Sequence, residues 1–452
     1  MILTRSNNPA PTANSGPIPA AERRQVGRRH FLGAAAATTA VGAAALAAPR
    51  MAFATPGNPA AGDAVVVVFL RGGADGLSLT PPYDHSSYQA LRPTIGIPPP
   101  GDPGGALPLV SAGNPNVVFP SGLDGIVGLH PALAPLHETM WASGNLAIIP
   151  ASGLPASESR TRSHFQAERY WERGSASPGV RSGWLNRLVA SQGVGTALPI
   201  VDKSYQPQDI TDGPAKALTV PDLRSFGLDG FRNRARGRTV LDSLYTGAQG
   251  AVSATGGDLL SVLDGVEALD STPSGAYPNN KLGRDFEQVA TMLRSGLGLY
   301  AAAIEFGGWD HHGDLGAPGD TDGRFWQRAS QLAAGLRAFT DDLATDGAIN
   351  ETSIIVITEF GRTINENGSG GTDHGRAATI MAMGGRIQGG VFGDDYPDVI
   401  EDDPTEGDLT VLTDYRKVIV EILANRVGLG PTGMNSVFPT YAPPASFLGL
   451  TR

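Results

Sequence analysis

The chain has 452 residues, with 44 acidic side chains against 34 Lys and Arg, and it contains no cysteine. Hydrophobic residues make up 41% of it, which is enough for a large core and argues against a disordered chain. The formal net charge of −10 disfavours nucleic-acid binding, and the lack of cysteine excludes disulfides, thiolate metal sites and cysteine nucleophiles.

The N-terminus has the order of an export signal. The twin-arginine pair Arg28-Arg29 precedes an uncharged, Ala-rich run, and Ala-Phe-Ala at 52–54 offers a cleavage site. We therefore expect a twin-arginine signal peptide over 1–54 and a linker over 55–62. The export machinery is then a partner, and the destination is the periplasm, the cell envelope or the medium. A membrane anchor is the alternative, but the run is short and weakly apolar, so no stable membrane span is expected.

Short apolar runs rich in β-branched residues predict strands buried on both faces. These runs cover 64–70, 145–150, 197–201, 299–306, 353–358 and 377–383. Helical patterns lie between or after them, most clearly at 163–173, 325–344 and 413–427. Strands that alternate with helices indicate an α/β fold, with a mostly parallel central sheet and helices on both faces.

Two stretches interrupt this alternation. Residues 93–120 are rich in Pro and Gly and predict a long surface loop. Residues 205–285 combine polar helical segments with Gly-rich joints, and we interpret them as an insertion or cap region. The remainder predicts one large domain over 63–450.

Residues able to carry chemistry gather directly after the predicted strands. Open parallel sheets place their sites at the carboxyl ends of the strands, so these residues are expected at one edge. They are Asp75, Ser163, His164, Asp310, His311, His312, Glu359, Arg362, Asp373 and His374. Imidazole and carboxylate without thiolate suit Zn²⁺, Mn²⁺ or Fe. The sequence therefore predicts a divalent metal site with one or two ions.

Several of these residues also have a plainer interpretation. Asp75 could be an ordinary turn residue, and Ser163 could serve only as a helix N-cap. His311 and His312 are adjacent, so only one of them is expected to ligate. Asp373 and His374 could form a local hydrogen-bonded pair.

Several motifs in order along the chain resemble the DUF1501 family of exported bacterial proteins. The matching stretches are FLRGGADGLSLTPPY (69–83), YQALRP (88–93), LHPALAPLH (129–137), RSHFQAERYWERG (162–174), GWLNRL (183–188), GGWDHH (307–312), TEFGRTINENGSGGTDHGRA (358–377) and TDYRKV (413–418). That family in turn resembles the alkaline phosphatase superfamily of phosphatases, phosphodiesterases, sulfatases and mutases. The resemblance implies an alkaline phosphatase-like fold.

The resemblance also implies roles for individual residues. Asp75, Asp310, His312, Glu359 and His374 match the places of metal ligands, and Ser163 matches the place of the nucleophile. The chain departs from the superfamily at Phe360, which stands where a second-site imidazole is expected, and in the tight Asp-x-His spacing at 310–312. A mononuclear site, or a second site completed by Asp373 or His164, follows from these departures.

The expected function is metal-dependent hydrolysis of a small anionic ester, either a phosphate or a related phosphodiester or sulfate. Ser163 would be the metal-activated nucleophile. His164 would protonate the leaving group if it faces inward, and Arg362 or Arg162 would clamp the non-bridging oxygens. The alternatives are a non-catalytic envelope protein with a structural metal, and a phosphoryl-group transferase.

Overall fold

A computed structural model describes residues 63–120, 122–227, 234–247, 249–269, 274–393, 396 and 407–452. The predicted signal peptide and linker lie outside the described residues. A search of the described helices for one long and apolar enough to cross a membrane found none.

A nine-stranded sheet forms the centre of the domain, in the order β10-β4-β9-β8-β1-β7-β5-β6, with β11 also paired to β4. Its strands are β1 (Ala64–Arg71), β4 (Leu146–Gly153), β5 (Ile200–Lys203), β6 (Ala217–Thr219), β7 (Ala301–Gly307), β8 (Thr352–Thr358), β9 (Ala378–Met383), β10 (Gly390–Val391) and β11 (Thr413–Asp414). A separate antiparallel pair joins β2 (Leu107–Pro108) to β3 (Gly128–Leu129).

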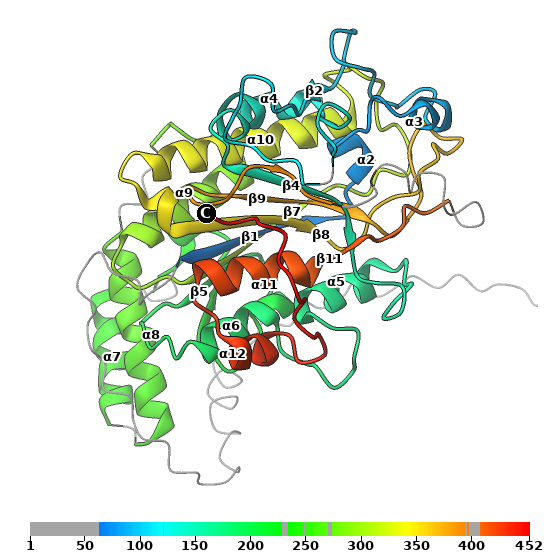
Figure 1. Ribbon diagram of the computed structural model, residues 1–452. Helices are drawn as coiled ribbons and strands as arrows, with labels where there is room; N and C mark the ends of the chain where they lie inside the picture. The colour runs from blue at the N-terminus through cyan, green and yellow to red at the C-terminus, as the bar shows by residue number, and fades with distance from the viewer. Residues whose placement is uncertain are drawn as a thin grey trace, which may run out of the picture. The chain divides into compact units, whose positions relative to one another are not determined.

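Helices cover both faces of this sheet. The α-helices of the described residues are α2 (Gly76–Leu79), α3 (Ser86–Leu91), α4 (Ala134–Leu136), α5 (His164–Arg173), α6 (Trp184–Ser191), α7 (Arg234–Thr246), α8 (Ala251–Glu267), α9 (Lys281–Arg294), α10 (Arg324–Ala344), α11 (Tyr415–Arg426) and α12 (Pro431–Val437). Figure 1 shows α9 and α10 on one side of the sheet and α6, α11 and α12 on the other.

Strand β1 shows why the sheet is buried on both faces. Successive side chains of a strand point to opposite faces. Val66, Val68 and Leu70 accordingly join the core that contains α9 and α10, whereas Val65, Val67 and Phe69 join the core that contains α6 and α11. An unbroken apolar run is what such a strand requires, and the run at 64–70 met that requirement.

The mixed α/β fold and the mostly parallel sheet are confirmed. Strand β1 pairs in parallel with both β7 and β8, and β5 pairs in parallel with β7. Strand β9 is the exception, because it runs antiparallel between β8 and β4. The chain therefore leaves the carboxyl end of β8, forms a loop, and enters β9 at the same edge. As a result, residues just before β9 lie beside residues just after β8.

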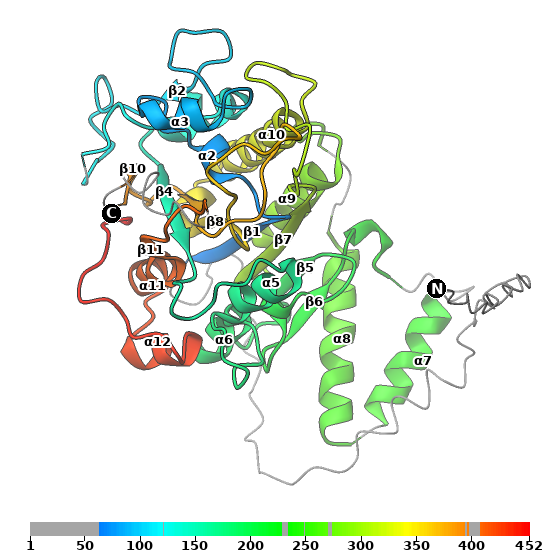
Figure 2. The ribbon, with the colours of Figure 1, turned by 90° about the vertical axis from the view of Figure 1, so that its right-hand side faces the viewer.

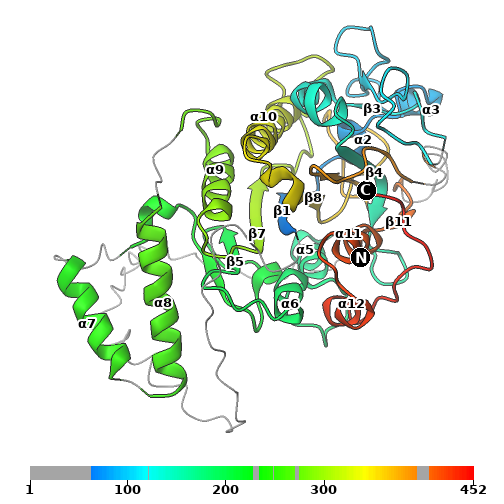
Figure 3. The same ribbon diagram turned by 60° about the vertical axis from the view of Figure 1, so that its left-hand side comes forward.

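The stretch 205–285 departs from the regular alternation. It supplies β6 at the edge of the sheet, and it supplies the helices α7 and α8, which pack against each other. Figures 2 and 3 show this helix pair standing out from the sheet. We still interpret this stretch as an insertion or cap region.

Candidate metal centre

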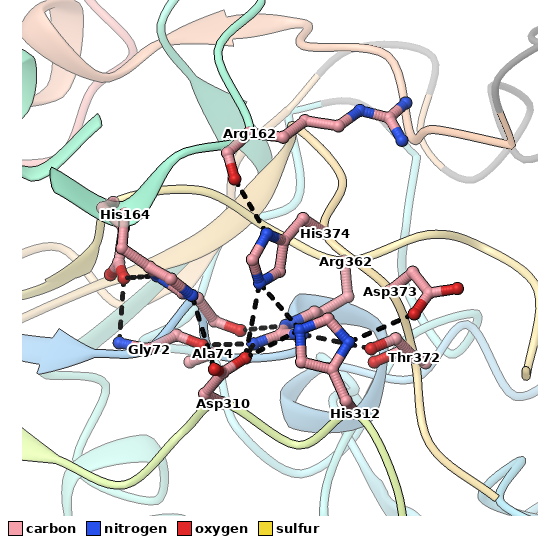
Figure 4. Close-up of polar contacts among 12 residues, drawn as sticks. Gly72, Ala74, Arg162, His164, Asp310, His312, Arg362, Thr372, Asp373 and His374 are labelled. Atoms are coloured by element: carbon pink, nitrogen blue, oxygen red, sulfur yellow. Dashed lines mark hydrogen bonds and ion pairs between the residues drawn. The ribbon is translucent and has the colours of Figure 1, made fainter. Parts of the chain in front are cut away.

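Three loops bring imidazole and carboxylate groups together at one edge of the sheet (Figure 4). The loop after β7 carries Asp310 and His312, and the loop between β8 and β9 carries His374. His164 comes from the segment after β4, where it is the first residue of α5. Single ligand atoms of His164, Asp310 and His374 all lie within 4.8 Å of one another.

The Nε2 atoms of two histidines point at the same carboxylate. Nε2 of His312 lies 3.1 Å from Oδ1 of Asp310, and Nε2 of His374 lies 3.4 Å from the same oxygen. The two Nε2 atoms are 2.9 Å apart. Oδ2 of Asp310 faces the third imidazole, with Nε2 of His164 at 3.5 Å. Asp310 is therefore the common centre of the three imidazoles.

The Nδ1 atom of each histidine is held by an acceptor on the outside of this group. Glu359 accepts from Nδ1 of His164 at 2.7 Å, and Asp373 accepts from Nδ1 of His312 at 3.1 Å. The carbonyl oxygen of Arg162 accepts from Nδ1 of His374 at 2.8 Å. Because an acceptor fixes the proton on Nδ1, each neutral imidazole directs the lone pair of Nε2 inward.

This arrangement fits a divalent cation. Inward lone pairs beside a carboxylate repel one another unless a cation or a proton lies among them. An outer carboxylate or carbonyl on the second ring nitrogen is also the usual environment of a metal-binding histidine. His164, Asp310 and His374 could hold the ion, and His312 is placed to join them. Imidazole and carboxylate donors suit Zn²⁺, Mn²⁺ or Fe.

The pKa shifts favour the ligand forms of two groups. Burial opposes ionisation of Asp310, but the Arg362 guanidinium outweighs burial and lowers the pKa of Asp310 to about 2. Partial burial lowers the pKa of His374, which favours the neutral imidazole. The hydrogen bond to Glu359 raises the pKa of His164 instead, so a proton competes for its Nε2 more strongly.

Arg362 holds Asp310 in position from the buried side of the centre. Its guanidinium is fully buried and donates to the carbonyl oxygens of Gly72, Gly73 and Thr372 as well as to Asp310. With these acceptors bound, Arg362 holds Asp310 and is not free to clamp a substrate. Gly72 has a φ of +118°, and a Cβ atom there would lie 2.5 Å from the backbone nitrogen of Asp310. The close crossing of these two loops therefore requires glycine.

Asp75 is not brought into this group. It is buried, and both of its carboxylate oxygens bind Arg92, while Ser78 donates a further hydrogen bond at 2.7 Å. Burial opposes ionisation of Asp75, but Arg92 outweighs it and holds the pKa below its ordinary value. Glu359 is also occupied, because it accepts from the backbone N–H of Gly72 and from Thr358 as well as from His164.

Ser163 and His311 have separate positions. Ser163 is exposed, sits directly before α5 as its N-cap residue and makes no capping hydrogen bond through its side chain. His311 is buried against Trp309 and Phe325, whereas His312 is 45% exposed and faces Asp310. Of these two adjacent histidines, His312 is therefore the one that reaches the cluster.

Several contributors carry no signal in the sequence pattern. Arg92 lies in the stretch at 88–93, and nothing in that pattern indicates its pairing with Asp75. The outer roles of Glu359 and Asp373 were also missed, because hydrogen bonding to Nδ1 depends on ring orientation. Asn367 was missed as well, and it holds Asp373 and the carbonyl oxygen of His312.

Comparison with solved structures found distant similarities. The lipoteichoic acid synthase LtaP from Listeria monocytogenes is 10% identical with a TM-score of 0.31, over 78% of this chain and 75% of that one. The alkaline phosphatase from the Antarctic bacterium TAB5 is 12% identical with a TM-score of 0.26, over 74% and 95%. A crystal structure of Ps i-CgsB with a neocarrahexaose is 8% identical with a TM-score of 0.32, over 73% and 68%.

A search of curated proteins found no match. A family model did match, and it is described as a protein of unknown function, DUF1501. The match covers residues 156–406, which is more than half of the chain and includes His164, Asp310, His312 and His374. The chain therefore belongs to the DUF1501 family.

Proposed function

We propose that this protein is a metal-dependent hydrolase of phosphate, phosphodiester or sulfate esters. The observation that carries the proposal is the inward orientation of three imidazoles around Asp310, each fixed by an outer acceptor. Such preorganisation is costly to assemble and has a clear use in holding a cation. Three core ligands would also leave a position for a substrate oxygen.

The proposed centre holds one ion. Asp75 and Glu359 match places of metal ligands in the resemblance, but Arg92 occupies Asp75, and His164, Gly72 and Thr358 occupy Glu359, so neither is available for a second ion. When bound, the ion would supply Lewis acidity and a lowered pKa for a coordinated hydroxyl group. In this proposal His164 is a ligand, and it is not available to protonate a leaving group.

The residues of the chain supply the remaining chemistry. Ser163 presents its hydroxyl one residue before His164, and its Oγ would displace the alcohol of the ester to form a seryl intermediate. Water would then hydrolyse that intermediate. The first turn of α5 presents backbone N–H groups and the positive end of the helix dipole to the anionic group. Arg362 would keep Asp310 ionised and in place.

The proposal is tested with the full-length protein and two serine variants. We expect about one equivalent of Zn, Mn or Fe by elemental mass spectrometry, and turnover of at least one ester in a panel of phosphate mono- and diesters and sulfate esters. Ser163→Ala should lose at least about 1,000-fold in kcat and keep its metal. Ser177→Ala, an exposed serine beyond α5, is the control. Full activity of Ser163→Ala would remove Ser163 from the mechanism, and lack of metal would refute the proposal.

A second candidate function rests on His312. If this fourth imidazole completes the coordination, the site becomes closed, as is typical of structural zinc. The protein would then be a non-catalytic envelope protein with a structural metal. Tight binding of one zinc, together with inactivity across the whole ester panel, would favour this candidate over the hydrolase.

Export by the twin-arginine pathway completes the proposal, and it is supported by the order of residues 28–54. Folding before export would allow the metal to be acquired inside the cell. Cell fractionation should find the wild-type protein outside the cytoplasm and the variant with both Arg28→Lys and Arg29→Lys inside it.

A further inference from the structure

A narrow crevice lies directly beside the metal centre. Its walls include Glu359 and Phe360 from the loop after β8, and Ser159 and Thr161 from the segment between β4 and α5. The Phe360 ring is shared by both places, because its centroid lies 4.8 Å from the His164 ring and 4.8 Å from the His374 ring. Glu359 and Phe360 therefore form a wall that the crevice shares with the centre.

Arg376 lines this crevice, and its buried Nε has no hydrogen-bond partner among the described residues. It lies two residues after His374, just before β9, and its backbone carbonyl is fixed by the N–H of Gly361. Within the described residues, its guanidinium takes part in none of the hydrogen bonds or ion pairs found. A half-buried guanidinium without an acceptor is unfavourable, because it has lost water without replacing it.

Three other arginines near the site are already bound to carboxylates. Arg71 contacts Glu172, and Arg162 pairs with Asp408 at 2.8 Å. Arg362 pairs with Asp310. Arg376 thus differs from these three in having its charge available in the crevice.

The remaining polar groups of the crevice are mainly donors. Ser159 accepts a hydrogen bond from the N–H of Thr161, and its own O–H has no acceptor among the described residues. The hydroxyl of Tyr170 likewise lacks one there. Glu359 is the acidic group of the crevice, but its oxygens are bound by His164, Gly72 and Thr358. An excess of donors around one cation is the environment that an oxyanion requires.

We infer that this Arg376 crevice is an anion-binding subsite for the substrate of the neighbouring centre. It would take a phosphate, sulfate or carboxylate group, with Arg376 as the main contact and Ser159 and Tyr170 as further donors. The inference rests on the proposed function and adds a specificity residue to it. It also replaces Arg362 and Arg162 as the arginine expected to recognise the anionic group.

Anion titration of the full-length protein tests this inference without any need for turnover. Inorganic phosphate, sulfate and acetate are titrated calorimetrically into the wild type, Arg376→Gln and Arg160→Gln, each with bound Zn²⁺ and after chelation. Arg160 is a matched control, since it is an exposed arginine of the same loop as Ser159. We expect Arg376→Gln to weaken binding of the preferred anion at least tenfold in both metal states, with metal content unchanged. Arg160→Gln should match the wild type.

The outcomes separate the inference from the proposed function. If anion binding disappears on chelation but is unaffected by Arg376→Gln, the ion alone holds the anion and the inference is wrong, while the hydrolase proposal gains support. If anion binding depends on Arg376 in a protein that takes up no metal, the subsite stands and the hydrolase proposal fails. Equal losses in Arg376→Gln and Arg160→Gln would point to general surface charge and overturn the inference.

Discussion

Asp75 and Asp310 are two aspartates at the same edge of the same sheet, and they have opposite environments. Asp75 follows β1, is buried, and has both oxygens bound to Arg92. Asp310 follows β7, which pairs with β1, and its side chain is 47% exposed and faces three imidazoles. The two aspartates thus have the same position after a strand, but their side chains have different partners.

The comparison shows what separates a structural carboxylate from a candidate ligand. Arg92 lies entirely inside the domain and leaves Asp75 without a free oxygen. Arg362 also binds Asp310, but it contacts Oδ1, and Oδ2 remains directed at His164. A buried arginine can therefore occupy both oxygens of a carboxylate, or it can hold the carboxylate through one oxygen and leave the other available.

The largest expected effect comes from breaking the Asp75–Arg92 pair. Asp75→Ala would leave a buried, uncompensated guanidinium, and we expect a loss of about 3–5 kcal/mol of unfolding free energy. Metal content per folded protein should stay at the wild-type value. Urea unfolding and elemental analysis measure the two quantities. Asp84→Ala, at an exposed aspartate, is the control.

A second change separates the two roles of Asp75. Adding Arg92→Met to Asp75→Ala removes the unpaired charge, so the double variant should regain part of the lost stability. Loss of metal in the stable double variant would contradict the structural assignment of Asp75.

Removing a ligand should give the opposite pattern. His374→Ala deletes one of the three core ligands at a partly exposed position, so we expect metal affinity to fall more than about 100-fold, beyond the loss typical of outer residues. The unfolding free energy of the metal-free protein should change little. Competition with a chromophoric chelator measures the affinity, with His85→Ala as the control. Wild-type affinity in His374→Ala would place the ion elsewhere.

A smaller effect is expected from an outer acceptor. Glu359→Gln keeps the shape of the side chain but removes the charge that fixes Nδ1 of His164. We expect metal affinity to fall about 10- to 100-fold, between the wild type and His374→Ala. A loss as large as that of His374→Ala would indicate that Glu359 ligates the ion directly.

The smallest effect concerns Glu168, which shares the guanidinium of Arg71 with other carboxylates. Glu168 lies 3.7 Å from Arg71, which also contacts Glu172 and Glu305, and burial raises the pKa of Glu168 to about 7. Folding raises this carboxyl pKa from its ordinary value of 4.5. The protonated Glu168 therefore contributes stability below pH 4.5, and this contribution is lost as the pH rises through 7.

Glu168→Gln isolates that contribution, because the amide resembles the protonated acid. Between pH 5 and pH 8 the wild type should lose about 1 kcal/mol of unfolding free energy relative to Glu168→Gln, after allowance for partial exposure. Urea titrations at both pH values measure the difference. A gain for the wild type over the same range would mean that Arg71 keeps Glu168 ionised.

The sequence by itself determined the strands and the edge at which the site forms. Apolar runs such as 64–70 and 353–358 can be buried on both faces only as central strands, so β1 and β8 followed directly from hydrophobicity. Asp310, His312 and His374 were also identifiable, since residues that follow parallel strands meet at one edge. That rule depends on order along the chain and needs no knowledge of side-chain contacts.

The tertiary structure alone decided which of these residues belong together. Arg92 lies 17 positions from Asp75 along the chain, and only folding brings it close enough to bind both carboxylate oxygens. The direction of the His164 ring was likewise open in the sequence, and the hydrogen bond from its Nδ1 to Glu359 directs its Nε2 towards Asp310. Hydrogen-bond pairing and ring orientation depend on distances of a few ångströms between distant segments. The pattern of residue types along a chain carries no such distances.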